Sequence, residues 1–138
     1  MKDVKAILDE AVRLKLHGVE DLVKHPIECL GTDYNGIGPS CFPEKLREYL
    51  DSLAPAFQPA ALIHDFRWSH SDGSEAAFEA SNLELEMNCN IIAKQKPVWH
   101  PQRYLMLWSA NTFVDIVKRF GWIAYQFAYT NQEEKPNE

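Results

Sequence analysis

Two adjacent residues, His64 and Asp65, are the residues of the chain best suited to do chemistry. Successive residues on a helix point about 100° apart, so the two side chains meet different neighbours rather than each other. A histidine that meets an acceptor through one ring nitrogen keeps the other nitrogen free as a general base. An aspartate that faces a loop of outward-pointing carbonyls forms an oxygen-rich cation site, which suits calcium. The pair therefore indicates general-base chemistry beside a bound cation.

A loop with unusual backbone requirements precedes this pair. Residues 32–43 read TDYNGIGPSCFP, with two Gly, two Pro, Asp, Asn and Ser within twelve residues. That composition is typical of tight turns, and Gly36 and Gly38 permit backbone conformations that other residues avoid. Any tight turn uses glycine, so the Gly-x-Gly pattern gains its meaning from Tyr34 before it and from the His-Asp pair after it. We expect one of the two side chains to face this loop and the other to face a partner helix.

Three short motifs within residues 32–92 recur in the same order in a known family. Tyr34, Gly36 and Gly38 have the spacing of a calcium loop, and HDFRW at 64–68 is similar to a His-Asp-x-x-Tyr helix with Trp68 at the Tyr position. A second helix follows, with Asn82, Leu85 and Asn88 at positions that the family fills with Asp, an apolar residue and Asn. The segment resembles the secreted phospholipase A2 family, and small phage and prophage proteins of unassigned role carry a similar arrangement.

The resemblance implies a calcium-dependent hydrolase of acyl esters, with a phospholipid or another ester as substrate. In such an enzyme His64 would activate a water molecule for attack on the ester carbonyl, and Asn82 would orient His64. Calcium would polarise that carbonyl and stabilise the oxyanion. The expected calcium ligands are the Asp65 carboxylate and the backbone carbonyls of Tyr34, Gly36 and Gly38.

Several positions depart from the family pattern. The family orients its histidine with an aspartate, whereas Asn82 is neutral and cannot stabilise an imidazolium by charge. Glu75 or Glu79, on the same predicted helix, could take over that role. The many disulfides of the family are missing, and Pro39 stands where its loop usually continues with Gly.

The elements that must position these residues are helices. Helical spacing and caps predict a first helix that Asp3 caps and Gly18 ends, and an irregular stretch or a short helical turn over 17–32. Further helices are expected over 44–53, from Pro59 through His70, from Ser74 to a point before Pro97, and from Pro101, where Gly121 is a possible break. The last helix is expected to pack through Leu105, Trp108, Thr112, Ile116 and Phe120. The short turn around Asp72 and Gly73 favours antiparallel packing of its two flanking helices.

The length and bulk composition fit one domain over 1–130 with a polar tail at 131–138, and the resemblance implies a mainly helical, phospholipase A2-like fold. The 138 residues are 46% hydrophobic and carry a net charge of −6, and no run of Lys or Arg forms a stripe along the sequence, so no nucleic-acid partner is expected. No apolar run is long enough for a transmembrane segment or a signal peptide, which predicts a cytoplasmic protein. Cys29, Cys41 and Cys89 are expected as buried free thiols, although a dyad of histidine with Cys29 or Cys41 stays open.

A second interpretation is a non-catalytic module, such as a phage-type accessory or assembly protein that keeps the helical fold. Its interaction surface, for a protein partner or a second copy, would be an exposed aromatic patch within 99–127. An open apolar cleft at His64 would favour the enzyme, whereas a closed environment that satisfies His64 or Asp65 would favour the module.

Overall fold

The computed structural model describes residues 4–27 and 55–133, and every regular element within them is helical. The elements are α1 (Val4–Arg13), α2 (Val19–Leu22), a 3-10 turn η1 (Pro55–Phe57), α5 (Gln58–Ser69), α6 (Glu75–Ala93) and α7 (Pro101–Glu133). The predicted helix over 44–53 and the loop at 32–43 lie outside the described residues. The expectation of a mainly helical protein is confirmed. No helix of the described part combines the length and apolarity needed to cross a membrane.

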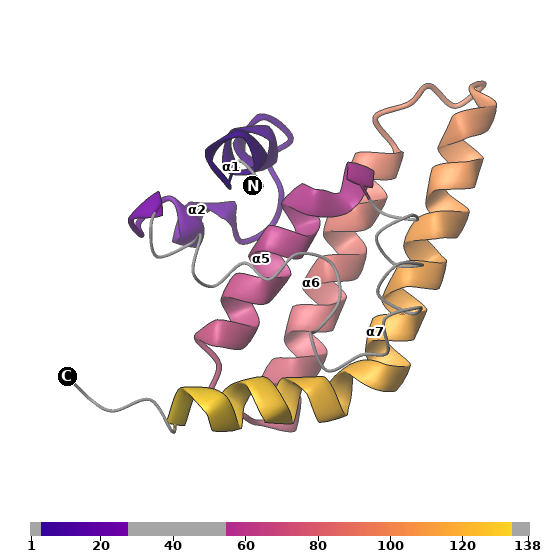
Figure 1. Ribbon diagram of the computed structural model, residues 1–138. Helices are drawn as coiled ribbons and strands as arrows, with labels where there is room; N and C mark the ends of the chain where they lie inside the picture. Colours follow the sequence, from indigo (N-terminus) through magenta and orange to yellow (C-terminus); the bar gives the residue numbers. More distant parts are fainter. Residues whose placement is uncertain (1–3, 28–54, 134–138) are drawn as a thin grey trace.

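Helix α5 is the centre of the described core. Its buried residues point in every direction around the helix axis, which is typical of a helix surrounded by other elements. Helix α6 lies beside it, α7 packs on α6, and α1 packs on the other side of α5 (Figure 1). The buried residues of α5 are Pro59, Ala60, Ala61, Leu62, Ile63, His64, Phe66 and Trp68.

The α5–α6 hairpin forms as the sequence predicts. Gly73 adopts the left-handed conformation (φ 81°) in the turn, and the Ser74 hydroxyl caps α6 by accepting a hydrogen bond from the Ala77 N–H at 3.1 Å. Tyr125 of α7 closes this end, because its hydroxyl donates to the Ser74 carbonyl at 3.0 Å and also contacts the Ser71 hydroxyl. The two helices run side by side in opposite directions (Figure 1).

The predicted packing face of α7 is wrong at Leu105 and Trp108, whereas Ile116 is half-buried and packs against the core. Ala110, Phe113, Val114 and Val117 are the buried residues in the middle of the helix, whereas Leu105 is 62% exposed and Trp108 is 58% exposed. Two apolar stripes run along this helix, and α6 packs against the one that carries the smaller residues and Phe113. The side chain of Phe120 lies outside the description.

The expected helix ends need further corrections. Helix α7 is one continuous helix through Gly121 to Glu133, three residues into the expected polar tail, but its course bends sharply in its second half (Figure 1). A Cβ at Gly121 would lie 3.3 Å from Cη2 of Trp68, so this glycine also permits close packing. Helix α1 ends at Arg13, before Lys15 (φ 54°) and Gly18 (φ 89°) turn the chain in left-handed conformations. The short helical turn expected within 17–32 appears as α2.

Candidate functional site

His64 and Asn82 meet across the α5–α6 hairpin. The Nε2 atom of His64 lies 2.9 Å from Oδ1 of Asn82, and the two side chains are 7% and 2% exposed. An amide oxygen only accepts hydrogen bonds, so the imidazole donates from Nε2 and Nδ1 is left as the nitrogen with the free lone pair. The eighteen-residue separation between them spans the last part of α5, the turn and the first two turns of α6.

Aromatic packing encloses the imidazole. The ring of Trp68, one helical turn after His64, lies with its centroid 4.4 Å from the imidazole centroid. The indole N–H of Trp68 donates to the Ser81 hydroxyl at 2.9 Å, and that hydroxyl donates to the Phe78 carbonyl at 2.8 Å. The indole is therefore fixed on both its polar and its apolar side, and it holds one face of His64 away from water.

Burial decides the protonation state of His64. Desolvation disfavours the imidazolium and lowers the pKa of His64 to about 4, and the hydrogen bond with Asn82 offsets only part of this effect. The imidazole is thus neutral across the physiological range. Neutral imidazole is the form that accepts a proton, but a pKa this low makes it a weaker base than an exposed histidine.

Asp65, the other half of the motif, is half-buried on the next position of α5. It is the one expected calcium ligand among the described residues, because Tyr34, Gly36 and Gly38 lie outside them. Within residues 4–27 and 55–133 no three His, Cys, Asp or Glu side chains cluster closely enough to hold a metal ion. A carboxylate oxygen fits the ligand chemistry of calcium, but one ligand is not a site, so the calcium expectation stays a prediction.

The remaining candidates of the sequence analysis lie apart from His64. Glu75 and Glu79 are exposed on the first turns of α6, and the neutral Asn82 is the residue that bonds the imidazole. Cys89 is buried with a free thiol, as expected, and its pKa is raised by desolvation first and by the charge of Glu86 second. Cys29 and Cys41, the two cysteines considered for a dyad, lie outside the described residues.

Two polar networks hold the site helices in register, and of their residues only Asn88 belongs to a motif of the sequence analysis. The Asn88 side chain accepts from the His17 N–H at 2.7 Å and donates to the His17 carbonyl at 3.0 Å, which ties α6 to the loop before α2. Arg67 donates to Glu84 at 3.0 Å and pairs with Asp21 at 2.9 Å, which joins α5 to α6 and α2. The residue types of the Arg67, Glu84 and Asp21 network are common on helix surfaces, so only its contacts reveal it.

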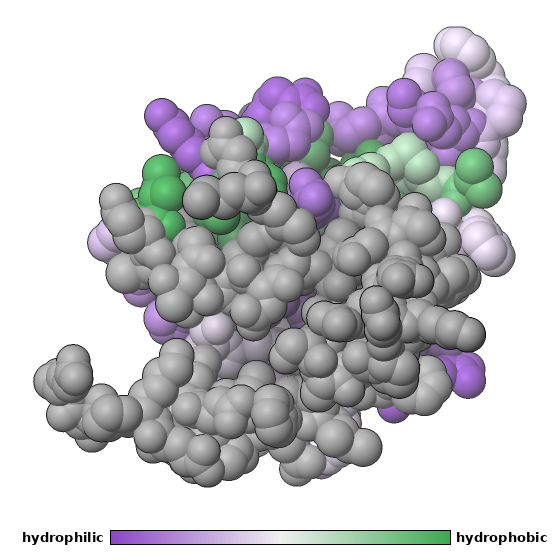
Figure 2. Space-filling view, viewed as in Figure 1, coloured by the Kyte–Doolittle hydropathy of each residue, from purple (hydrophilic) through white to green (hydrophobic). Residues whose placement is uncertain are grey.

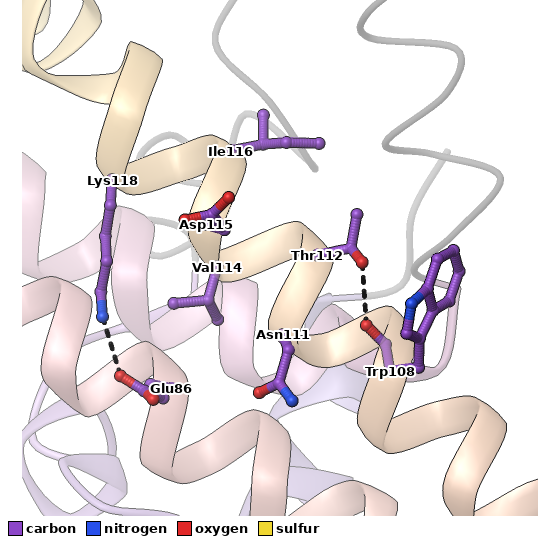
Figure 3. Close-up of a pocket in the computed structure, with 8 residues that line it drawn as sticks. All are labelled: Glu86, Trp108, Asn111, Thr112, Val114, Asp115, Ile116 and Lys118. Atoms are coloured by element: carbon purple, nitrogen blue, oxygen red, sulfur yellow. Dashed lines mark hydrogen bonds and ion pairs between the residues drawn. The ribbon is translucent and has the colours of Figure 1, made fainter.

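Two hollows lined by described residues lie away from His64. One, of about 460 Å³, lies against α7 and α6, where Trp108 forms an edge and the Lys118 ammonium pairs with Glu86 at 2.9 Å (Figure 3). The other, of about 440 Å³, lies between α1, the start of α5 and the end of α6, and includes Pro59 and Ile92. Neither has the His64 imidazole in its wall, so within the described residues His64 has the closed, satisfied environment that the sequence analysis associates with the non-catalytic module.

The site is described from the chain's own residues. No family model matches the sequence, and no curated protein and no solved structure matches it at a significant level.

Proposed function

We propose that the protein hydrolyses acyl esters, with His64 as the general base and Asn82 as its positioning residue. The observation that carries the proposal is the 2.9 Å contact between His64 Nε2 and Asn82 Oδ1. A base must be neutral, and it must be held in one tautomer and one orientation. The contact, the Trp68 ring and the burial of both partners supply these conditions.

The step that follows from this geometry is proton removal from water. Nδ1 of His64 accepts the proton while the water oxygen attacks the ester carbonyl, and the imidazolium returns the proton to the leaving alkoxide. Asn82 keeps its bond to Nε2–H throughout, so the ring does not turn. Asp65 and the carbonyls of Tyr34, Gly36 and Gly38 are the proposed calcium ligands, and calcium would polarise the ester carbonyl.

The test measures hydrolysis of a phospholipid and of a chromogenic acyl ester against pH, with and without calcium. Because the pKa of His64 is about 4, we expect kcat/KM to fall only near that pH on the acid side, well below the value of 6.5 for an ordinary histidine. His64→Gln should remove activity while the fold persists. Unchanged activity in His64→Gln would exclude His64 as the base.

Calcium is tested separately by thermal melting of the wild type and of Asp65→Ala in parallel. A ligand that binds only the native state adds about 2.7 kcal/mol at a hundredfold excess over its Kd, so the wild type should melt at a higher temperature. The shift should vanish in Asp65→Ala. No shift at millimolar calcium would remove the proposed electrophile.

A non-catalytic module is the second candidate, and one observation favours it. His64 is buried with its Nε2 satisfied, which is also what a purely structural histidine requires. The aromatic residues expected to form the interaction surface divide into two groups. Trp99, Tyr104 and Trp108 are exposed, whereas Trp122 is half-buried and Tyr125 is buried. Absence of both hydrolysis and a calcium shift would select this candidate.

A further inference from the structure

Acidic residues are absent from the distal half of the α6–α7 hairpin. Residues 87–114 contain three of the chain's 14 Lys and Arg and none of its 20 Asp and Glu. The segment therefore carries a charge of +3, and the rest of the chain carries −9. The three cations, Lys94, Lys96 and Arg103, all lie within ten residues around the turn. A local cationic end in an acidic protein indicates attraction to an anionic surface at that end.

The same end exposes large apolar side chains. We call residues 94–105 the hairpin tip. It includes Trp99, which is 78% exposed, together with Val98, Tyr104 and Leu105, each more than half exposed. In Figure 1 the tip projects beyond the other helices, and Figure 2 shows pale and green atoms beside purple ones on that projection. Apolar and cationic groups thus share one convex surface.

Hydrogen bonds hold the tip in this conformation. The Tyr104 hydroxyl donates to the Val98 carbonyl at 2.6 Å, and the Arg103 guanidinium donates to the Lys96 carbonyl at 3.2 Å. The His100 N–H donates to the Pro97 carbonyl at 2.9 Å. The exposed indole of Trp99 is therefore presented by an ordered turn, and a partner would not have to order the turn on binding.

We propose that the hairpin tip docks the protein on the anionic surface of a lipid bilayer. Trp and Tyr rings favour the boundary between headgroups and acyl chains, and Lys and Arg near that boundary gain about 1 kcal/mol each from anionic lipids. A protruding turn with Trp99 at its tip enters such a boundary without a groove in the partner. The docking depends on neither His64 nor ester hydrolysis.

The charges and the shape argue against two other occupants. A second copy would bring its own three tip cations against these three, which disfavours tip-to-tip association. An acidic peptide would need a groove, and the hollow beside α1 that includes Lys96 contains none of the exposed apolar residues of the tip, Val98, Trp99, Tyr104 and Leu105. The hollow in Figure 3 begins only at Trp108, farther along α7.

The test is flotation of the protein with vesicles of phosphatidylcholine alone and of phosphatidylcholine mixed with phosphatidylglycerol. We expect binding to the mixed vesicles only, with loss at high salt, because the Debye length shrinks to about 3 Å at 1 M. Trp99→Ala and the double variant Lys94→Glu/Lys96→Glu should each lower the affinity for mixed vesicles at least about tenfold.

Matched controls keep the result specific to the tip. Lys5→Glu/Lys24→Glu makes the same change in net charge at exposed positions near the other end of the chain, and Leu83→Ala removes an exposed apolar side chain outside the tip. Both should bind mixed vesicles like the wild type, and His64→Gln should do so as well. Docking is overturned if the wild type does not bind mixed vesicles, or if the control pair loses as much affinity as the tip pair. If sedimentation shows that the wild type is a dimer and that Trp99→Ala is a monomer, the tip mediates self-association instead of membrane docking.

Discussion

The His64 imidazole and the Asn82 amide, 2.9 Å apart, form a buried pair in which neither partner carries a charge. A neutral amide orients the ring through one hydrogen bond, but it adds no negative charge that would offset the desolvation of an imidazolium. This is why the pKa of His64 lies at about 4, below its ordinary value. The identity of residue 82 therefore controls how strong a base His64 is.

Asn82→Asp should raise the pKa of His64 well above 4. A carboxylate at the Oδ1 position keeps the geometry and adds a charge that favours the imidazolium in a site of low dielectric. The change is measured by NMR titration of the His64 ring protons. If His64 is the general base, hydrolysis near neutral pH should increase in the same variant. A pKa that stays near 4 would show that residue 82 does not control His64.

The free energy of unfolding should decrease as the pH is lowered from about 6.5 to about 4. The unfolded chain protonates His64 near 6.5 and the folded chain only near 4, so the unfolded state binds more protons within this window. The contribution is complete above pH 6.5, and up to about 3 kcal/mol is lost as the pH falls through 4. Urea unfolding at several pH values measures this loss.

The control for this pH dependence is His64→Gln, which retains a side chain that can hydrogen-bond but cannot titrate. Its free energy of unfolding should depend less on pH between 6.5 and 4 than that of the wild type. Parallel curves for the wild type and His64→Gln would contradict the assignment.

The sequence predicts the α5–α6 hairpin better than helix α7, for a physical reason. Ser74 and Gly73 are local signals, since a cap and a left-handed turn need no distant partner. Helix α7 carries two apolar stripes, and its packing against α6 and α5 decides which of them is buried. The sequence suggests a break at Gly121; the helix is continuous but bent in its second half (Figure 1), and the close approach of Trp68 to Gly121 depends on tertiary contacts.

The candidate site was predictable only in part. The spacing of His64 and Asn82 on two adjacent helices indicates that they can meet, and the structure places them in contact. The enclosure of His64 by Trp68, which depends on the Ser81 hydroxyl, is not visible in the sequence because serine occurs on every kind of helix face. The loop at 34–38 lies outside the described residues, so its calcium role stays a prediction.

Asn88→Ala should destabilise the fold by about 2–3 kcal/mol. Both the N–H and the carbonyl of His17 depend on this side chain, and its removal leaves two partly buried backbone groups without these bonds. Urea unfolding measures the loss. Asn90→Ala, two positions later on α6 and half-buried, is the control and should change stability by less than about 0.5 kcal/mol. Equal losses in the two variants would contradict the tie between α6 and His17.

Gly18→Ala should lower stability by about 1–2 kcal/mol for two separable reasons. At φ 89° an alanine pays the left-handed backbone cost, and its Cβ would lie 2.9 Å from Nη2 of Arg67 and 2.9 Å from Oε2 of Glu84. These two contacts push apart the Arg67–Glu84 ion pair that joins α5 to α6. Repeating the substitution in a Glu84→Ala background separates the two effects, since it removes the carboxylate and leaves the backbone cost. Thermal or urea unfolding of all four chains should show a smaller loss in that background. The same loss in both backgrounds would mean that the backbone conformation alone requires glycine and that the ion pair adjusts freely.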